Sequence, residues 1–260
     1  MSSRDTHAFC KLCLEEGVRK PRRGTVYLNG KLLCTFHYKR EILLRNLNEI
    51  AQLAKEVTER VKGKVAPEFS DYHVLKALLT LSTKAPIDRK TLSNILGIGE
   101  ASVRTLINRL KEKNLVIVRK RLGCFPTDRC LSLISRWKSV VSTTNNLNLG
   151  DLALDRFNSC ACLREGGILI EDHHTIILRD LMIKNGASAA LIIKAQKGKI
   201  RIPMVEKENF KGLTEIKRVF VPRNNDLILI SYAKDIINSE KALFKTIFSI
   251  TEVRELKGRK

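Results

Sequence analysis

The sequence lacks the long apolar stretches that mark membrane and secreted proteins. No run of about 18 apolar residues occurs, which excludes a membrane-spanning helix. The first twenty residues lack the apolar core of a secretory signal, so we expect a cytoplasmic protein. Low-complexity tracts and repeats of solenoid period are also missing, which excludes a repeat architecture.

Recognisable catalytic motifs are missing as well. The sequence contains no nucleophile elbow, no phosphate-binding P-loop and no metalloprotease motif. We therefore expect a protein that is not an enzyme.

Acidic residues are few relative to basic ones. The chain has 48 Lys and Arg against 27 Asp and Glu, a formal net charge of +21. Residues 1–66, 67–149 and 150–260 carry net charges of +7, +8 and +6, so the first two segments are the more basic per residue. This excess favours a polyanionic partner, with nucleic acid first, the ribosome second and an anionic membrane third. A hydrophobic fraction of 43% is enough to form packed cores.

Two short motifs near the start of the chain predict a metal site. Cys10 and Cys13 form one CxxC pair, and Cys34 and His37 form a CxxH pair, with twenty residues between the two pairs. Three thiolates and one imidazole are a closed tetrahedral ligand set for structural zinc, with no position left open for catalysis. The sequence therefore predicts one structural zinc ion and assigns no reaction to it.

The residues between these pairs predict the local fold of a small finger, residues 1–40. Asn29-Gly30 between apolar residues is a strong hairpin signal, because both turn positions need a positive φ. A helical pattern begins just after His37, and the order of knuckle, hairpin and helix resembles a treble-clef finger. The loop at residues 19–23 is basic, and its Arg22 and Arg23 are candidate phosphate contacts.

A long helix is expected to follow the finger. Its apolar residues, from Leu43 to Val61, are spaced alternately by four and three as in an a/d seam, and Gly63 ends the helix. This linking helix, residues 41–66, has two possible partners for its seam. It either pairs with a second copy in a homodimer, which we favour slightly, or lies against the next domain.

Residues 67–141 predict a winged helix-turn-helix. Two helical stretches, about residues 71–81 and 88–96, lead to the turn Gly97-Ile98-Gly99 and then to a third helix at about 100–113. A β-branched strand at 115–118 and a basic tip follow. Residues 130–134 are either the returning strand or the start of another helix.

The outer face of the third helix carries the candidate base-reading residues. A recognition helix needs donors toward its N-terminal half for base edges and cations for phosphates. We expect Arg104, Thr105 and Asn108 to reach bases, and Arg109 and Lys111 to contact the backbone. The full predicted nucleic-acid-binding set is Arg22, Arg23, Arg89, Lys90, Ser102, Arg104, Thr105, Asn108, Arg109, Lys111, Arg119, Lys120 and Arg121. The last three form the tip of the wing, which fits phosphates or the minor groove.

Residues 95–106, followed by Arg109-Leu110-Lys111, resemble the winged-helix stretch of archaeal transcriptional regulators. The stretch is similar to the DNA-binding part fused to archaeal riboflavin kinases, and to an archaeal family of uncharacterised winged-helix proteins. The latter similarity extends through the C-terminal segment and covers about 190 of the 260 residues. It implies DNA binding, whereas kinase activity is not implied because no nucleotide-binding glycine motif is present.

Residues 150–260 predict a C-terminal α/β domain for dimerisation or ligand sensing. We expect strands at 167–170, 189–193, 199–203, 219–221 and 227–231, and helices at 174–185 and 236–248. Residues 142–146 are polar and are interpreted as a linker. Cys160 and Cys162 have no partner pair, so a structural role is favoured for both.

Together these features predict an α+β multidomain protein with a treble-clef-like zinc finger, a long helix, a winged helix and a C-terminal α/β domain. The leading hypothesis is a sequence-specific transcriptional regulator that binds double-stranded DNA as a homodimer, without a membrane partner. The alternative is an RNA- or ribosome-binding factor that uses the same basic surface.

Overall fold

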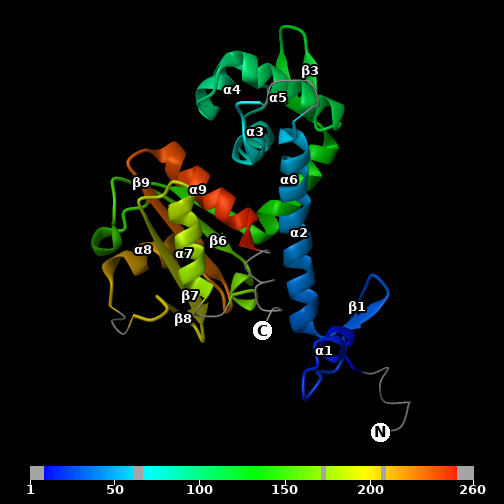
Figure 1. The fold of residues 1–260 in the computed structure, drawn as a ribbon, viewed down its shortest axis with the longest axis vertical. Helices are drawn as coiled ribbons and strands as arrows, with labels where there is room; N and C mark the ends of the chain where they lie inside the picture. Colours follow the sequence, from blue (N-terminus) through cyan, green and yellow to red (C-terminus); the bar gives the residue numbers. More distant parts are fainter. Residues whose placement is uncertain (1–8, 61–66, 171–173, 206–208, 251–260) are drawn as a thin grey trace.

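The computed structural model of the protein describes residues 9–60, 67–170, 174–205 and 209–250. A single long helix, α2, organises the molecule (Figure 1). The small finger lies at its N-terminal end and the winged helix at its C-terminal end, while the C-terminal unit lies beside it. This arrangement confirms the predicted α+β multidomain architecture.

The finger has the predicted order of knuckle, hairpin and helix. Its elements are α1 (Lys11–Glu15), β1 (Val26–Leu28), β2 (Lys31–Leu33) and the first turns of α2 (Thr35–Thr58). Strands β1 and β2 are antiparallel, and Asn29 and Gly30 turn the chain with φ of 48° and 74°. The left-handed backbone that this turn requires explains the Asn-Gly pair.

Helix α2 has 24 residues and is about 36 Å long. Its apolar seam, represented by Leu43, Ile50 and Val57, is at most 1% exposed and packs within the chain against helices of the following units. The second of the two expected partners therefore covers the seam, and these residues are not available for a coiled coil with another copy. The helix ends at Thr58, before the predicted end, and the predicted stop at Gly63 lies outside the described residues.

The winged-helix unit contains three helices and a hairpin, as expected. They are α3 (Asp71–Lys84), α4 (Arg89–Leu96), α5 (Glu100–Glu112), β3 (Val116–Arg119) and β4 (Gly123–Pro126). Asp88 caps α4 by accepting a hydrogen bond of 2.8 Å from the backbone N–H of Thr91. Gly97 ends α4 with φ of 66°, which makes the tight turn into α5.

Residues 130–134 belong to a helix, which decides between the two expected alternatives. The returning strand of the wing is β4, and α6 (Asp128–Val140) begins directly after it. Thr127 caps α6, and Cys130, Ile134 and Trp137 face the core with at most 1% exposure. Cys124 and Cys130 are buried free thiols.

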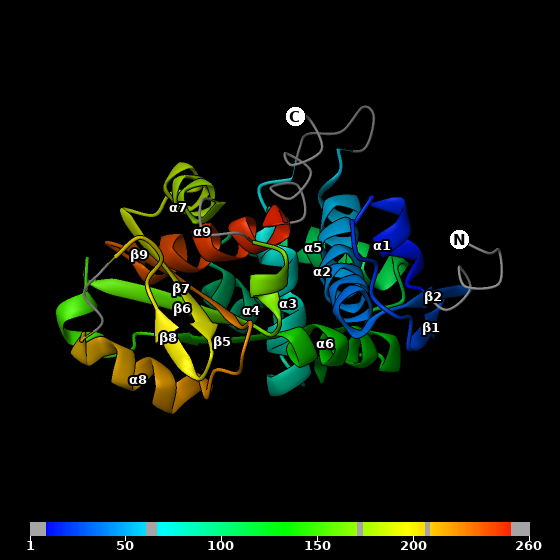
Figure 2. The same cartoon turned by 90° about the horizontal axis from the view of Figure 1, so that it is seen from below.

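The C-terminal unit is built on a five-stranded antiparallel sheet of order β5-β6-β9-β7-β8. Its strands are β5 (Val141–Asn145), β6 (Phe157–Leu163), β7 (Ala189–Gln196), β8 (Lys199–Arg201) and β9 (Leu227–Ala233). Helices α7 (His174–Lys184) and α9 (Ile236–Phe248) cover one face, and α8 (Lys211–Phe220) covers the other (Figure 2). The hairpin β7–β8 and the last helix agree with the sequence prediction.

Three sequence interpretations of this unit were wrong. The polar segment 142–146 is not a linker: residues 141–145 form the edge strand β5, which hydrogen-bonds to β6. Residues 167–170 are not a strand: residues 166–168 form a 3-10 turn, in which a Cβ added to Gly166 or Gly167 would lie within 2.9 Å of neighbouring atoms. Residues 219 and 220 end the amphipathic helix α8, and Val221 caps it, so 219–221 is not a strand either.

One hydrophobic core runs through α2, the winged-helix unit and the α7/α9 side of the sheet. A second, smaller core lies between the sheet and α8, and it includes Cys160 and Cys162 at 0% exposure. These two cysteines therefore have the structural role that was predicted. Among the helices of the described ranges, none combines the length and the apolar character that crossing a membrane requires.

Candidate metal centre and nucleic-acid interface

Four donor atoms converge in the finger. The Sγ atoms of Cys10, Cys13 and Cys34 and a ring nitrogen of His37 lie within 4.8 Å of one another, and all four residues are buried. His37 Nδ1 is 3.1, 3.4 and 3.5 Å from the three sulfurs in that order. Sulfur and nitrogen ligands of one tetrahedral ion would be about 3.5 Å apart, given metal–ligand distances of about 2.3 and 2.0 Å. This cluster can hold a metal ion.

Local backbone structure prepares the thiols for this role. Cys10 and Cys34 occupy the N-cap positions of α1 and α2, where backbone N–H groups are unpaired. Burial raises the pKa of the Cys10 thiol, but the backbone N–H groups of Cys34 and Cys13, with the His37 side chain, outweigh burial and lower this pKa to about 6. Thiolates are the metal-binding form of cysteine, so this environment favours ligation by Cys10, whereas burial raises the pKa of the Cys13 thiol.

A carboxylate outside the donor set orients the histidine. Glu16 Oε2 lies 3.2 Å from His37 Nε2, on the ring edge opposite the sulfurs. Arg40 donates to the same carboxylate at 2.7 and 3.2 Å. Burial raises the pKa of Glu16, but the hydrogen bonds and charge of Arg40, followed by those of His37, have the larger effect and lower this pKa below its usual value. A carboxylate that accepts from a ligating histidine fixes its tautomer, so Glu16 supports Nδ1 as the ligand atom.

Sequence reasoning missed Glu16 and Arg40. No motif links an acid three residues after Cys13 to a base three residues after His37, and only the fold brings them together. The two arginines predicted in the finger loop are exposed: the Arg22 guanidinium lies 4.7 Å from the centroid of the Phe36 ring, and Arg23 forms a backbone bridge with Phe9.

Helix α5 presents two different polar stripes. Arg104, Asn108 and Lys111 are exposed at i, i+4 and i+7, and within the described part of the chain their side chains make no hydrogen bond or ion pair. Thr105 is exposed beside them, with its hydroxyl donating to the Ala101 carbonyl. This stripe is available to a partner.

The second stripe is occupied by the protein itself. Arg109 donates to the carbonyl oxygens of Val57 at 2.6 Å and Glu59 at 2.9 Å, and lies 5.5 Å from the Phe69 ring centroid. Ser102 donates to Glu68 at 2.6 Å. We expected both residues to contact nucleic acid, but in the structure Arg109 bonds to the end of α2 and Ser102 to the segment before α3. Arg109 satisfies carbonyl groups at the end of α2 that lack a helical partner.

The remaining predicted cations are exposed. Lys120 and Arg121 lie in the turn between β3 and β4, with Arg121 at φ of 65°, and Arg119 lies over Phe125 at 5.0 Å. Arg89 and Lys90 begin α4 on the surface. The tip also exposes Leu122, whose residue is 60% accessible. The structure thus keeps a basic wing next to the exposed stripe of α5.

Fold and site together define a class of protein: a winged helix joined to an antiparallel α/β unit, with a Cys3His finger at the start. Residues 74–130 match the family model described as PH0730-like, N-terminal domain, and residues 154–250 match a domain of unknown function, DUF4443. Neither model includes the finger. No curated protein matches the chain.

A solved structure shows the same fold over most of the chain. It is described as hypothetical protein PH0730 from Pyrococcus horikoshii OT3, with a TM-score of 0.56 and 22% sequence identity. The match covers 71% of this chain and 94% of that one. The expected similarity to an uncharacterised archaeal family is confirmed at the level of fold, and DNA-binding regulation stays a prediction.

Proposed function

We propose that this chain is a sequence-specific DNA-binding transcriptional regulator that reads the major groove with α5. The observation that carries this proposal is the exposed stripe of Arg104, Asn108 and Lys111, which lacks an intramolecular partner among the described residues. Arginine and asparagine side chains pair with guanine and adenine edges, and each good pair is worth about 1–3 kcal/mol of discrimination.

The wing supplies the second contact of the proposal. Arg119, Lys120 and Arg121 follow α5 directly and project from a short hairpin, as residues that grip phosphates or enter the minor groove do. Arg89 and Lys90 at the start of α4 add cations to the same unit. Arg109 is not among the proposed phosphate contacts, because its guanidinium hydrogen-bonds to the end of α2.

The experiment starts by selecting a binding site from a random duplex library with the full chain. We expect Arg104→Ala to weaken the selected site by about 1–3 kcal/mol and to leave random duplex nearly unchanged. Replacing Arg119, Lys120 and Arg121 with Ala should weaken both duplexes and reduce the salt dependence.

A matched control replaces Lys184, Lys217 and Lys234 of the C-terminal unit with Ala, which changes the charge equally and should leave binding almost unchanged. Equal loss on selected and random duplex from Arg104→Ala would refute the base-reading role.

We further propose that the metal in the finger is zinc. The buried Cys3His set has soft thiolates, a neutral imidazole and no exposed donor, which are properties of a structural zinc site. Elemental analysis of the purified chain should give one zinc per chain, and Cys13→Ser should lose it. Cys160→Ser, also a buried thiol, should keep the metal. A different metal at full occupancy would overturn the assignment.

One observation favours RNA as an alternative partner. Tyr27 on the finger hairpin is 72% exposed, and the basic loop at 19–23 belongs to the same small unit. Exposed aromatic rings beside cations stack the bases of single strands. Crosslinking in cells, with sequencing of both DNA and RNA, separates the proposals: discrete genomic sites support the regulator, whereas ribosomal or other RNA supports the alternative.

A homodimer remains part of the proposal, with two copies of α5 about one DNA turn apart on a near-palindromic site. The buried seam of α2 does not provide its interface, so the surface must lie elsewhere. Light scattering of the full chain alone and with the selected duplex measures the stoichiometry.

A further inference from the structure

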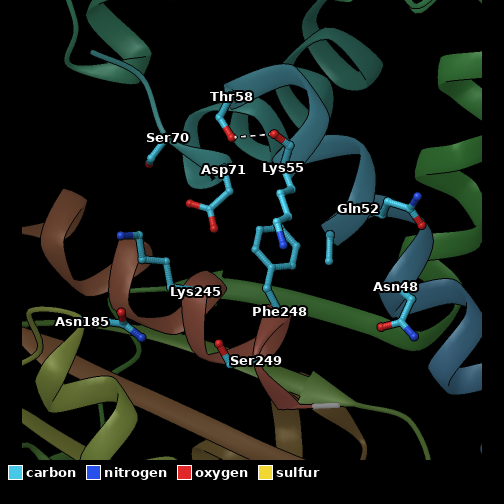
Figure 3. A pocket seen from close by; sticks show the side chains of 11 residues that line it. Asn48, Gln52, Lys55, Thr58, Ser70, Asp71, Asn185, Lys245, Phe248 and Ser249 are labelled. Atoms are coloured by element: carbon cyan, nitrogen blue, oxygen red, sulfur yellow. Dashed lines mark hydrogen bonds between the residues drawn. The ribbon is translucent and has the colours of Figure 1, made fainter. Parts of the chain in front are cut away.

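A polar cleft of about 760 Å³ lies away from both the metal centre and the exposed stripe of α5. One wall is the C-terminal half of α2, and the N-terminus of α3 and the C-terminal ends of α7 and α9 complete it (Figure 3). The cleft is therefore formed where α2, the winged-helix unit and the C-terminal unit meet. Its volume lies in the range of small-molecule sites, about 300–1,000 Å³.

The charges lining the cleft favour an anionic ligand. Lys55 of α2 and Lys245 of α9 both point into it, and among the described residues neither ammonium group is paired with a carboxylate. Asp71 is the single carboxylate among the lining residues, and one of its oxygens already accepts from the backbone N–H of Tyr72 at 2.9 Å. The lining groups thus carry one net positive charge in a partly enclosed space.

The cleft also offers a surface for a flat ring. Phe248 is half-buried, and Figure 3 shows its ring close to the Lys55 side chain in projection, with Lys245 to one side. Trp137, only 1% exposed, packs behind it with ring centroids 5.9 Å apart and fixes its position. A ring held in place by a buried neighbour can stack a planar ligand without losing much side-chain entropy.

Amide side chains line other parts of the cleft. Asn48 and Gln52 lie on successive turns of α2, and Asn185 follows the end of α7 on the other side of the cleft. The Gln52 amide donates to Glu56 at 3.3 Å, whereas Asn48 and Asn185 each offer a donor and an acceptor, which suits the polar edges of a heterocycle better than an aliphatic ligand.

From these observations we infer that the cleft binds a nucleoside monophosphate. The base stacks on Phe248, Asn48 and Asn185 meet its edges, and Lys55 and Lys245 bind the phosphate. This inference does not depend on the proposed DNA binding, because none of these residues lies in α5 or the wing.

Trp137 provides the measurement, since it is the only tryptophan of the chain and contacts Phe248. The full, metal-loaded chain is titrated separately with AMP, GMP, CMP and UMP, and with adenosine and inorganic phosphate as partial ligands. We expect a saturable fluorescence change with at least one mononucleotide, and at least tenfold weaker binding of adenosine and of phosphate. Thermal unfolding with the same ligands gives a second readout, because a ligand of the native state raises Tm.

The variants Lys55→Gln and Lys245→Gln should each weaken mononucleotide binding at least tenfold. Lys84→Gln, at the exposed far end of α3, is the matched control and should bind like the unmodified chain. The inference is overturned if no mononucleotide gives a saturable response up to about 1 mM, where the binding free energy is only about −4 kcal/mol. It is also overturned if both lysine variants bind normally, or if phosphate alone binds as tightly as the mononucleotide.

Discussion

The hydroxyl of Tyr72 donates a 2.9 Å hydrogen bond to the carboxylate of Glu240, which is 168 residues away in the chain. Lys76 donates to both oxygens of the same carboxylate at 2.5 and 2.6 Å, and Asn145 donates at 2.7 Å. Glu240 is only 7% exposed, so its charge depends on these partners. This network joins α3 of the winged helix to α9 and β5 of the C-terminal unit.

We expect Glu240→Ala to lower the unfolding free energy by about 3 kcal/mol, because it leaves Lys76 without its buried partner and Tyr72 and Asn145 without an acceptor. Tyr72→Phe removes one hydrogen bond and should cost about 1 kcal/mol. Denaturant unfolding of each variant and of the double variant measures the coupling. The control is Lys234→Ala, on the surface beside α9, which should change the unfolding free energy little. An equally small change for Glu240→Ala would show that the network contributes little to stability.

His73 makes the stability of the winged-helix unit depend on pH. Burial lowers its pKa from 6.5 to about 4, with Lys241 and Lys245 acting in the same direction and Asp71 against them. Its neutral Nδ1 accepts a 2.9 Å hydrogen bond from the Ser70 backbone N–H, which completes a capping box.

Because the folded pKa lies below the unfolded one, the unfolded chain binds more protons between pH 6.5 and about 4. The contribution of His73 is fully present above pH 6.5 and is lost as the pH falls toward 4, up to about 3 kcal/mol. His73→Gln keeps the capping box without titrating in this range, so its stability should fall less on acidification. Parallel pH curves of unfolding free energy for both proteins would contradict this prediction.

Glu16 should control metal affinity without binding the metal. Glu16→Gln weakens the acceptor of His37 Nε2–H, and we expect metal affinity to fall about 10–100-fold in competition with a chelating dye. Glu15→Gln is a matched control, since Glu15 is adjacent but pairs with exposed Lys31 at 3.4 Å. Equal affinities of the two variants would mean that Glu16 does not orient the ligand.

Arg109 and Lys111, two residues apart on α5, should give opposite phenotypes. Arg109→Ala removes two hydrogen bonds to the end of α2 and should cost about 1–3 kcal/mol of stability. Lys111→Ala should change stability by no more than about 0.5 kcal/mol and should reduce the salt slope of duplex binding by about one. Unfolding and salt-dependent binding of both variants check this pair, and loss of stability in Lys111→Ala would place its side chain in a structural contact.

Several features of the fold were predictable because their causes lie within a few residues. Asn29-Gly30 sets its own turn, Gly97 ends α4 in the left-handed region, and the cap at Asp88 acts on the first turn of α4. The metal donors were also predictable, since two pairs of fixed spacing identify them without any knowledge of the fold.

The polar strand β5 was not predictable from its own residues. Its stability comes from pairing with β6, with Ser142 opposite Cys162 and Thr144 opposite Cys160, rather than from an apolar pattern. The prediction of a strand at residues 219–221 was wrong for a related reason. The β-branched Val219 favours a strand, but burial of Ile216 and Phe220 against the sheet outweighs that preference and extends α8.

The sequence by itself determined the candidate metal ligands, the helix-turn-helix and the excess of positive charge, because each follows from residue type and short spacing. Only the tertiary structure decided which polar side chains are available. It assigned Arg109 to the end of α2 but left Arg104 exposed, placed Glu16 behind His37, and buried Glu240 among partners from two other elements. These assignments depend on contacts between distant segments, and burial and hydrogen bonding across them are properties of the packed molecule.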